Sequence, residues 1–161
     1  MNEYRDKEEP IAALLSAASK AASSRQLDAA EPLLLQALGR EPNNLNALDL
    51  LGYVYFFQGR YAECARLCEK ALTIQPGHPY ALSGLGMALA KQGDVALGIE
   101  KLEAAMTAAP EQPEPYWDAA VLLIEAQEPM RAASILKKGI EFSPRNASRF
   151  SALLSKIETD E

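Results

Sequence analysis

The chain has 161 residues, of which 48% are hydrophobic and 24% charged, and its formal net charge is −6. This length and composition are typical of one globular domain or one short repeat array, and they exclude a disordered chain. The acidic balance, without a cluster of Lys and Arg, argues against nucleic acid or an anionic membrane as the main partner, because phosphate groups are bound by clustered cations.

The first ten residues, MNEYRDKEEP, carry mixed charges, whereas a secretory signal would be basic and then apolar. We expect residues 1–10 to form a flexible segment. No apolar run in the sequence reaches the length of a membrane-spanning helix, and two cysteines are too few for a disulfide framework. We therefore expect a cytoplasmic protein that is not inserted in a membrane.

Four prolines spaced 34 residues apart, Pro42, Pro76, Pro110 and Pro144, indicate an internal repeat. Aligning the chain on them gives four units without insertion or deletion: 11–44, 45–78, 79–112 and 113–146. Residues at equivalent places in the units agree in size. A large residue recurs at Leu14, Leu48, Leu82 and Tyr116, a small one at Ala18, Gly52, Gly86 and Ala120, and a second small one at Ala30, Cys64, Gly98 and Ala132.

The second unit shows which secondary structure this pattern predicts. Its first apolar residues recur at i, i+3, i+4 and i+7, as on one face of a helix: Leu48, Leu51, Gly52 and Tyr55. Gly59, in the sequence QGR, then supplies a turn. A second apolar helix face follows at Tyr61, Cys64, Cys68 and Ala71. Because Pro76 cannot extend that helix, it marks the next loop, and each unit is predicted to be a helical hairpin.

The order of residues in a unit is a large residue, Leu-Gly, Tyr, a turn, and then small, large, small and Pro. This order resembles the tetratricopeptide repeat, and the resemblance covers residues 11–146. It implies an all-α fold, a right-handed α-solenoid of stacked antiparallel helical hairpins, in which each repeat contacts only the next. The first unit departs from the pattern with Ala21 in place of Tyr and with Pro32, which is expected to delay or distort the start of its second helix. In the fourth unit, Gln127 replaces the turn glycine.

Residues 147–158, which follow the last repeat, are predicted to form an amphipathic capping helix that closes the array. Its apolar residues again recur at helical spacing: Phe150, Leu153, Leu154 and Ile157. The acidic tail, 159–161, is expected to fray.

Catalytic, metal and cofactor chemistry is not expected from this sequence. Cys64 and Cys68 lie four residues apart, but His78 is the single histidine and structural zinc requires four ligands. The two cysteines instead occupy the core places that Ala30 and Leu34 hold one unit earlier. We expect His78, just before a helix start, to be a solvated loop residue. No glycine-rich phosphate loop or nucleophile elbow occurs, so we expect no enzyme activity and no cofactor.

The resemblance implies that the first helix of each hairpin lines a concave groove. In the first unit the groove-facing residues are Ala12, Leu15, Ser19 and Ala22. In the other units they are Asn46, Asp49, Tyr53, Phe56, Phe57, Tyr80, Ser83, Met87, Glu114, Trp117, Val121 and Ile124. Aromatic and aliphatic residues dominate the middle of this set, which favours a protein or peptide partner with two or three apolar anchor residues. The alternative is that these side chains merely pack between repeats.

Repeats of this family that hold the acidic C-termini of heat-shock proteins use a clamp of Lys, Asn and Arg. The corresponding places here hold Leu15, Ser19, Leu50, Tyr80 and Gly84. Shifted by one unit, they hold Asp49, Tyr53, Gly84, Glu114 and Asp118. Neither register supplies a cation, so an acidic ligand would be repelled.

Three functions remain after these exclusions. The first is an adaptor whose groove binds an apolar or amphipathic segment of a partner protein. The second is a chaperone of the type III secretion class, which keeps translocator proteins soluble and uses a comparable groove. The third is a structural scaffold that self-associates through its repeat ends, with the alanine-rich residues 12–22 as the less closed end.

Overall fold

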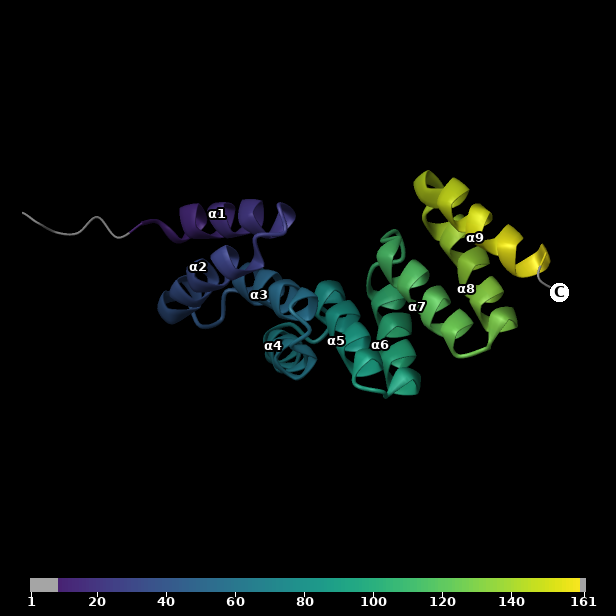
Figure 1. Ribbon diagram of the computed structural model, residues 1–161, viewed down its shortest axis with the longest axis horizontal. Helices are drawn as coiled ribbons and strands as arrows, with labels where there is room; N and C mark the ends of the chain where they lie inside the picture. Colours follow the sequence, from purple (N-terminus) through teal and green to yellow (C-terminus); the bar gives the residue numbers. More distant parts are fainter. Residues whose placement is uncertain (1–8, 160–161) are drawn as a thin grey trace, which may run out of the picture.

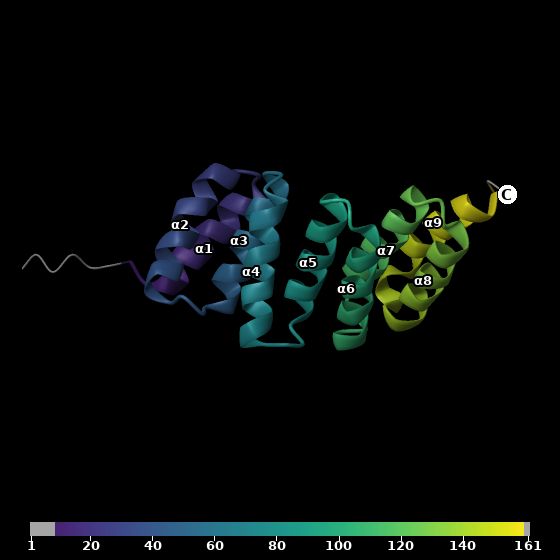
Figure 2. The same cartoon turned by 90° about the horizontal axis from the view of Figure 1, so that it is seen from below.

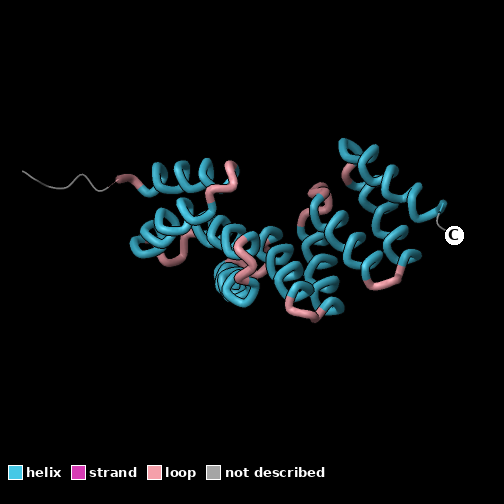
Figure 3. Tube along the Cα trace, viewed as in Figure 1, coloured by secondary structure: helices cyan, strands magenta, loops and turns pink. Residues whose placement is uncertain are grey.

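The computed structural model describes residues 9–159, which form helices and no strand (Figures 1 and 3). The helices are α1 (Ile11–Ser23), α2 (Leu27–Arg40), α3 (Leu45–Phe57), α4 (Tyr61–Ile74), α5 (Pro79–Lys91), α6 (Val95–Ala108), α7 (Glu114–Glu125), α8 (Pro129–Phe142), the 3-10 helix η1 (Pro144–Asn146) and α9 (Ala147–Thr159). Each 34-residue unit thus contains one pair of helices joined by a short turn.

The helix pairs follow one another along the long axis of the molecule, from α1 at one end to α9 at the other (Figures 1 and 2). Each pair packs on the next, and the first helices α1, α3, α5 and α7 also contact one another in sequence. The buried core divides into a large cluster over α1 to α5, a second over α5 to α9 and a small third one made of Leu14, Ala37 and Ala47. The architecture is therefore an all-α solenoid, stabilised by contacts between neighbouring hairpins.

Contacts with the array hold both ends of the described part of the chain. Residues 1–8 and 160–161, which include most of the two segments expected to be flexible, lie outside the described residues. The main-chain oxygen of Glu9, however, accepts hydrogen bonds from both terminal nitrogens of Arg40 at 2.7 Å. At the other end, Phe150 of α9 is fully buried, and Thr159 is still helical.

The turn within every hairpin contains one residue with positive φ. These residues are Arg25 at 60°, Gly59 at 78°, Gly93 at 102° and Gln127 at 62°, again spaced 34 residues apart. In this left-handed region a Cβ atom approaches the following carbonyl oxygen, which costs about 1–2 kcal/mol in a residue other than glycine. The outer two hairpins therefore form their turns against a local strain that the inner two avoid.

The two helices of a hairpin cross where both carry small residues. In the third hairpin a Cβ atom added to Gly86 would lie 2.7 Å from the main-chain oxygen of Gly98, and one added to Gly98 would lie 2.6 Å from the oxygen of Gly86. Both glycines are buried. The backbones of α5 and α6 are therefore too close at this point for any side chain.

Pro32 does not shift the start of α2, so the expected delay was wrong. The helix has 14 residues, as do α4, α6 and α8 at the equivalent places. An internal proline costs about 3 kcal/mol through one lost hydrogen bond and a steric clash. Ala30 and Leu34 on either side are fully buried, and their packing holds the helical backbone in place.

A polar cluster joins the first two hairpins. Arg60 binds Glu31 of α2 at 2.8 Å and Glu63 of α4 at 2.6 Å. Its guanidinium also lies 3.8 Å from the centre of the Tyr55 ring. The hydrogen bond from Arg60 lowers the pKa of Glu31, which keeps that carboxylate ionised.

Exchanging the turn residues of the third and fourth hairpins tests the strain at positive φ. We expect Gln127→Gly to raise the free energy of unfolding by about 0.5–1 kcal/mol, because glycine relieves the strain. Gly93→Gln should lower it by a similar amount, since open space surrounds Gly93 and strain is the main cost. Urea denaturation of the two variants measures both changes, and equal stabilities would contradict the strain.

Gly98→Ala tests the close approach of α5 and α6. The added methyl group must push the helices apart, and we expect a loss of about 1–3 kcal/mol in the free energy of unfolding. Gly39→Ala is the matched control, because the Cβ position of this helical glycine is open. Alanine there should stabilise the protein by up to about 1 kcal/mol. Denaturation curves in which Gly98→Ala is neutral would refute the predicted clash.

Candidate functional site

A groove with a volume of about 550 Å³ runs across the first helices of units one to three. We call it the first-helix groove, and it is lined by Leu15, Ser16, Ser19, Asn46, Asp49, Leu50, Tyr53 and Tyr80. These residues come from α1, α3 and α5, whose contacts with one another create the groove. The second helices contribute nothing to its lining.

The sequence-predicted groove residues of unit two and the start of unit three meet in this groove. Asn46, Asp49, Tyr53 and Tyr80 line it, together with two of the four residues expected from unit one, Leu15 and Ser19. Tyr53 is 40% exposed and Tyr80 63% exposed, whereas the leucines are half-buried. The groove therefore combines two half-buried leucines with two exposed aromatic rings.

His78 corrects the expectation of a solvated loop residue. Its side chain is 12% exposed, and Nε2 lies 2.7 Å from Oδ2 of Asp49. An ionised carboxylate can only accept, so the histidine nitrogen donates. Burial raises the pKa of Asp49, while the bond to His78 opposes that rise. His78, the residue just before α5, thus fixes the acidic residue of the groove from the far end of the same 34-residue unit.

The aromatic cluster at the end of α3 divides between the exposed face and the hairpin interior. The rings of Tyr53 and Phe57 lie 4.5 Å apart, and the guanidinium of Arg25 lies 4.7 Å from the centre of the Phe57 ring. Phe56, in contrast, packs edge-on against Tyr61 of α4 at 5.4 Å. Phe57 therefore extends the aromatic face beside the groove, while Phe56 belongs to the packing inside the hairpin.

The other sequence-predicted residues do not line the first-helix groove. They lie further along α5 and on α7, namely Ser83, Met87, Glu114, Trp117, Val121 and Ile124. Met87, Trp117 and Ile124 pack against the C-terminal core cluster. The guanidinium of Arg149, on α9, lies 3.9 Å from the centre of the Trp117 ring. The capping helix thus covers the aromatic residue that the sequence placed in the groove.

Asp118, next to Trp117 on α7, is a partly buried carboxyl group. Burial raises its pKa from the ordinary value of 3.8 to about 6, and the negative charge of Glu114 adds to the rise. The positive charge of Arg149 opposes it. Because the folded state favours the protonated form, ionisation of Asp118 destabilises the fold at neutral pH.

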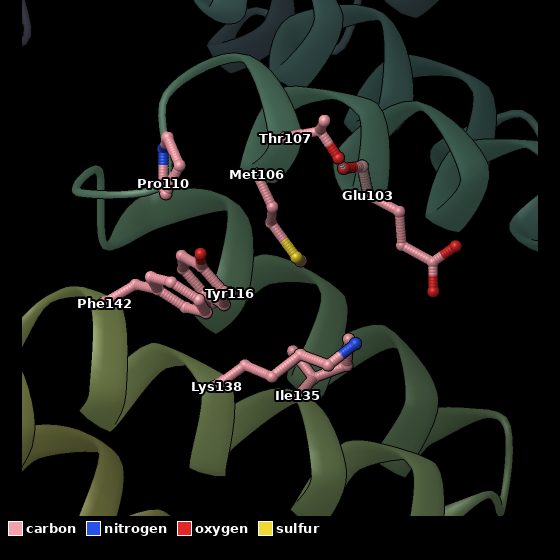
Figure 4. Close-up of a pocket in the computed structure, with 8 residues that line it drawn as sticks. All are labelled: Glu103, Met106, Thr107, Pro110, Tyr116, Ile135, Lys138 and Phe142. Atoms are coloured by element: carbon pink, nitrogen blue, oxygen red, sulfur yellow. Dashed lines mark hydrogen bonds between the residues drawn. The ribbon is translucent and has the colours of Figure 1, made fainter.

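A second cavity, which the sequence did not predict, lies mainly between second helices (Figure 4). It has a volume of about 470 Å³ and is lined by Glu103, Met106, Thr107, Pro110, Tyr116, Ile135, Lys138 and Phe142. We call it the second-helix pocket. Phe142, 48% exposed, lies at its edge. An apolar residue at the exposed end of α8 was the signal available in the sequence.

Cys64 and Cys68 are buried and are not joined by a disulfide, as expected for core positions. Their mutual hydrogen bond and burial raise the pKa of the Cys68 thiol, which keeps it in the unreactive neutral form. Between residues 9 and 159, His, Cys, Asp and Glu side chains nowhere gather in a group of three that could hold a metal ion. No helix in the described part of the chain combines the length and apolar character needed to cross a membrane.

Asp118→Asn tests the buried carboxyl group through the pH dependence of stability. Because the folded pKa of Asp118 is raised, the free energy of unfolding falls as the pH rises from about 4 to about 6, and asparagine removes that loss. We expect the variant to be more stable by up to about 3 kcal/mol at pH 8, at about 1.4 kcal/mol per unit of pKa. The gain should shrink as the pH falls through 6 and vanish below about 4.

Urea denaturation between pH 5 and pH 8 measures this difference. Glu100→Gln is the matched control, because Glu100 is 66% exposed and pairs only with Lys101. Its stability relative to the unmodified protein should not change with pH. A constant difference for Asp118→Asn across the range would contradict the raised pKa.

Solved structures share this fold. A mutant O-GlcNAc transferase from Thermobaculum terrenum is 28% identical, with a TM-score of 0.76, over 81% of this chain and 26% of that chain. MamA from Desulfovibrio magneticus is 20% identical, with a TM-score of 0.73, over 86% of this chain and 78% of that one. A thermophilic tetratricopeptide-repeat protein from Thermus thermophilus is 15% identical, with a TM-score of 0.80, over 94% of this chain and 82% of that one. The chain spans about a quarter of the transferase chain, and the other two likenesses show the fold alone.

Family models point the same way. Two models described as tetratricopeptide repeat match residues 45–78 and residues 89–157. Curated proteins include no match to this chain. The two matched ranges span the second unit, most of the third, all of the fourth and most of the capping helix. The chain belongs to the tetratricopeptide repeat family, whose all-α arrays are scaffolds for protein–protein interaction.

Proposed function

We propose that this protein is a non-enzymatic cytoplasmic adaptor that binds an apolar or amphipathic segment of a partner protein in the first-helix groove. The observation that carries the proposal is the pair of exposed rings, Tyr53 and Tyr80, over a groove of about 550 Å³. Exposed aromatic side chains beside a concave apolar surface are typical of sites that anchor a partner.

Packing of the repeats does not require these two tyrosines. The place of Tyr53 is taken in the other units by Ser19, Met87 and Val121. The place of Tyr80 is taken by Ala12, Asn46 and Glu114. Small and polar residues are therefore compatible with the hairpin at both positions. This supports a binding role for the two rings over the alternative that they merely fill space between repeats.

The chaperone and scaffold functions make different demands on the same molecule. A chaperone of the type III secretion class would use the same groove, and the identity of the bound protein would distinguish it from a general adaptor. Self-association through the repeat ends would need an open end. Phe150 of α9 is buried against the last hairpin, and the helix turns Ser151 and Lys156 to solvent, which disfavours stacking there.

Capture of partner proteins with groove variants tests the proposal. We expect Tyr53→Ser and Tyr80→Asn, combined, to lower recovery of the partner at least tenfold, because both rings are lost. The substitutions copy Ser19 and Asn46, so the fold should be unaffected. Phe142→Ala, which copies Ala108 and alters the second-helix pocket, is the matched control and should leave recovery unchanged.

Quantitative mass spectrometry of the captured proteins gives the comparison, with circular dichroism to verify that each variant is folded. A partner that the double variant retains, or that Phe142→Ala loses, would contradict binding in the first-helix groove. A captured protein that is the same chain, with mass in solution rising with concentration, would favour the scaffold instead.

A further inference from the structure

We propose that the segment bound in the first-helix groove carries a lysine or arginine next to a large aliphatic residue, and that Asp49 binds this cation between Tyr53 and Tyr80. The inference rests on the proposed function, since it assumes that the groove holds a partner segment. It adds a charge requirement that adaptor activity alone does not include.

Asp49 has one carboxylate oxygen available to a partner. Oδ2 is taken by Nε2 of His78 at 2.7 Å, whereas no described residue donates to Oδ1. The side chain is 22% exposed, so in the free protein water can reach it. A guest that covers the groove would remove this water. A purely apolar guest would thus leave a charged oxygen without a donor, which is strongly unfavourable.

A cationic donor fits the surroundings of this oxygen better than a neutral one. A hydrogen bond to an ionised group is about twice as strong as one between neutral groups, and a cationic donor adds a direct attraction between opposite charges. Tyr53 and Tyr80, which line the same groove, present exposed rings that attract a Lys or Arg side chain over their faces. Half-buried Leu15 and Leu50 supply the apolar contact for an aliphatic neighbour. The groove therefore has matching places for one cation and one aliphatic side chain.

Positive charge of the protein itself does not occupy this place. The residues that line the groove include no Lys or Arg. Three arginines contact aromatic residues of the first helices, but none of them lines the groove: Arg25 lies over Phe57, Arg60 over Tyr55 and Arg149 over Trp117. The net charge of −6 also attracts a basic segment and repels an acidic one.

Selection from a random library of displayed 12-residue peptides tests the inference without knowledge of the natural partner. The full-length protein is immobilised, and bound peptides are sequenced. We expect the selected peptides to share a Lys or Arg within two or three residues of Leu, Ile, Met or Phe. Selection on Asp49→Asn should retain the apolar residue and lose the basic one, because asparagine keeps a hydrogen bond with His78 but removes the charge.

Affinity measurements on one selected peptide make the test quantitative. Replacing its basic residue by norleucine should weaken binding to the unmodified protein about tenfold, as expected for loss of a charge-assisted hydrogen bond. The same replacement should have little effect on binding to Asp49→Asn. Glu103→Gln, a carboxylate variant in the second-helix pocket, is the matched control and should respond as the unmodified protein does.

The outcomes separate this inference from the proposed function. Two results would overturn the charge requirement and leave the adaptor function standing. In the first, the selected peptides compete for the groove but show no preference for a basic residue. In the second, they carry a neutral donor or an acidic residue in its place. Two other results would overturn both the charge requirement and the adaptor function. Either the double variant Tyr53→Ser with Tyr80→Asn binds the selected peptides as well as the unmodified protein does, or the selection yields no peptide at all.

Discussion

The close crossing of the two helices in each hairpin is the constraint on which the rest of the structure depends. Small residues occupy both sides of every crossing: Ala18 and Ala30, Gly52 and Cys64, Gly86 and Gly98, Ala120 and Ala132. All of them are buried. In the third hairpin even a methyl group would overlap the opposite backbone. The third crossing is tighter than the second, where a Cβ atom added to Gly52 would lie 3.8 Å from Sγ of Cys68, an ordinary contact. These crossings fix how each hairpin presents its outer face to the next.

This geometry leaves one side of the array to the first helices, and the groove forms there. The repeat determines that α1, α3 and α5 lie next to one another, but it does not determine which residues face outward between them. At those positions the chain carries two tyrosines, an aspartate and two leucines in the N-terminal half. In the C-terminal half the equivalent surface is partly covered by α9, with Arg149 over Trp117. The binding surface that we propose is thus confined to the first three units.

The sequence was sufficient for the fold because each core position recurs in every unit. Periodic small and large residues identified the hairpins, the core role of Cys64 and Cys68, and the turns, even where Gln127 takes the place of glycine. Pro32 misled the prediction because a local penalty was weighed without the burial of Ala30 and Leu34 on the same helix. Six residues that line the groove were also predicted, from the resemblance to the family together with helical periodicity: Leu15, Ser19, Asn46, Asp49, Tyr53 and Tyr80.

Contacts between side chains far apart in the chain could not be predicted in the same way. The bond between His78 and Asp49 joins a residue of α3 to the residue just before α5, 29 positions later, so it depends on how one hairpin is placed against the next. The same holds for the cover of Trp117 by the capping helix. Phe56 turned inward because its neighbour Tyr61 lies across the turn, which a helical wheel does not include. These are properties of side-chain rotamers and superhelical twist, not of sequence periodicity.

Photo-crosslinking in cells tests most directly whether the first-helix groove is where this protein acts. A benzophenone amino acid placed by the substitution Tyr80→p-benzoyl-phenylalanine would report contacts at the groove, and Phe142→p-benzoyl-phenylalanine would report those at the second-helix pocket. Both positions are exposed, at 63% and 48%. We expect a discrete crosslinked partner from position 80 and none from position 142. A partner crosslinked from position 142 alone would contradict binding in the first-helix groove.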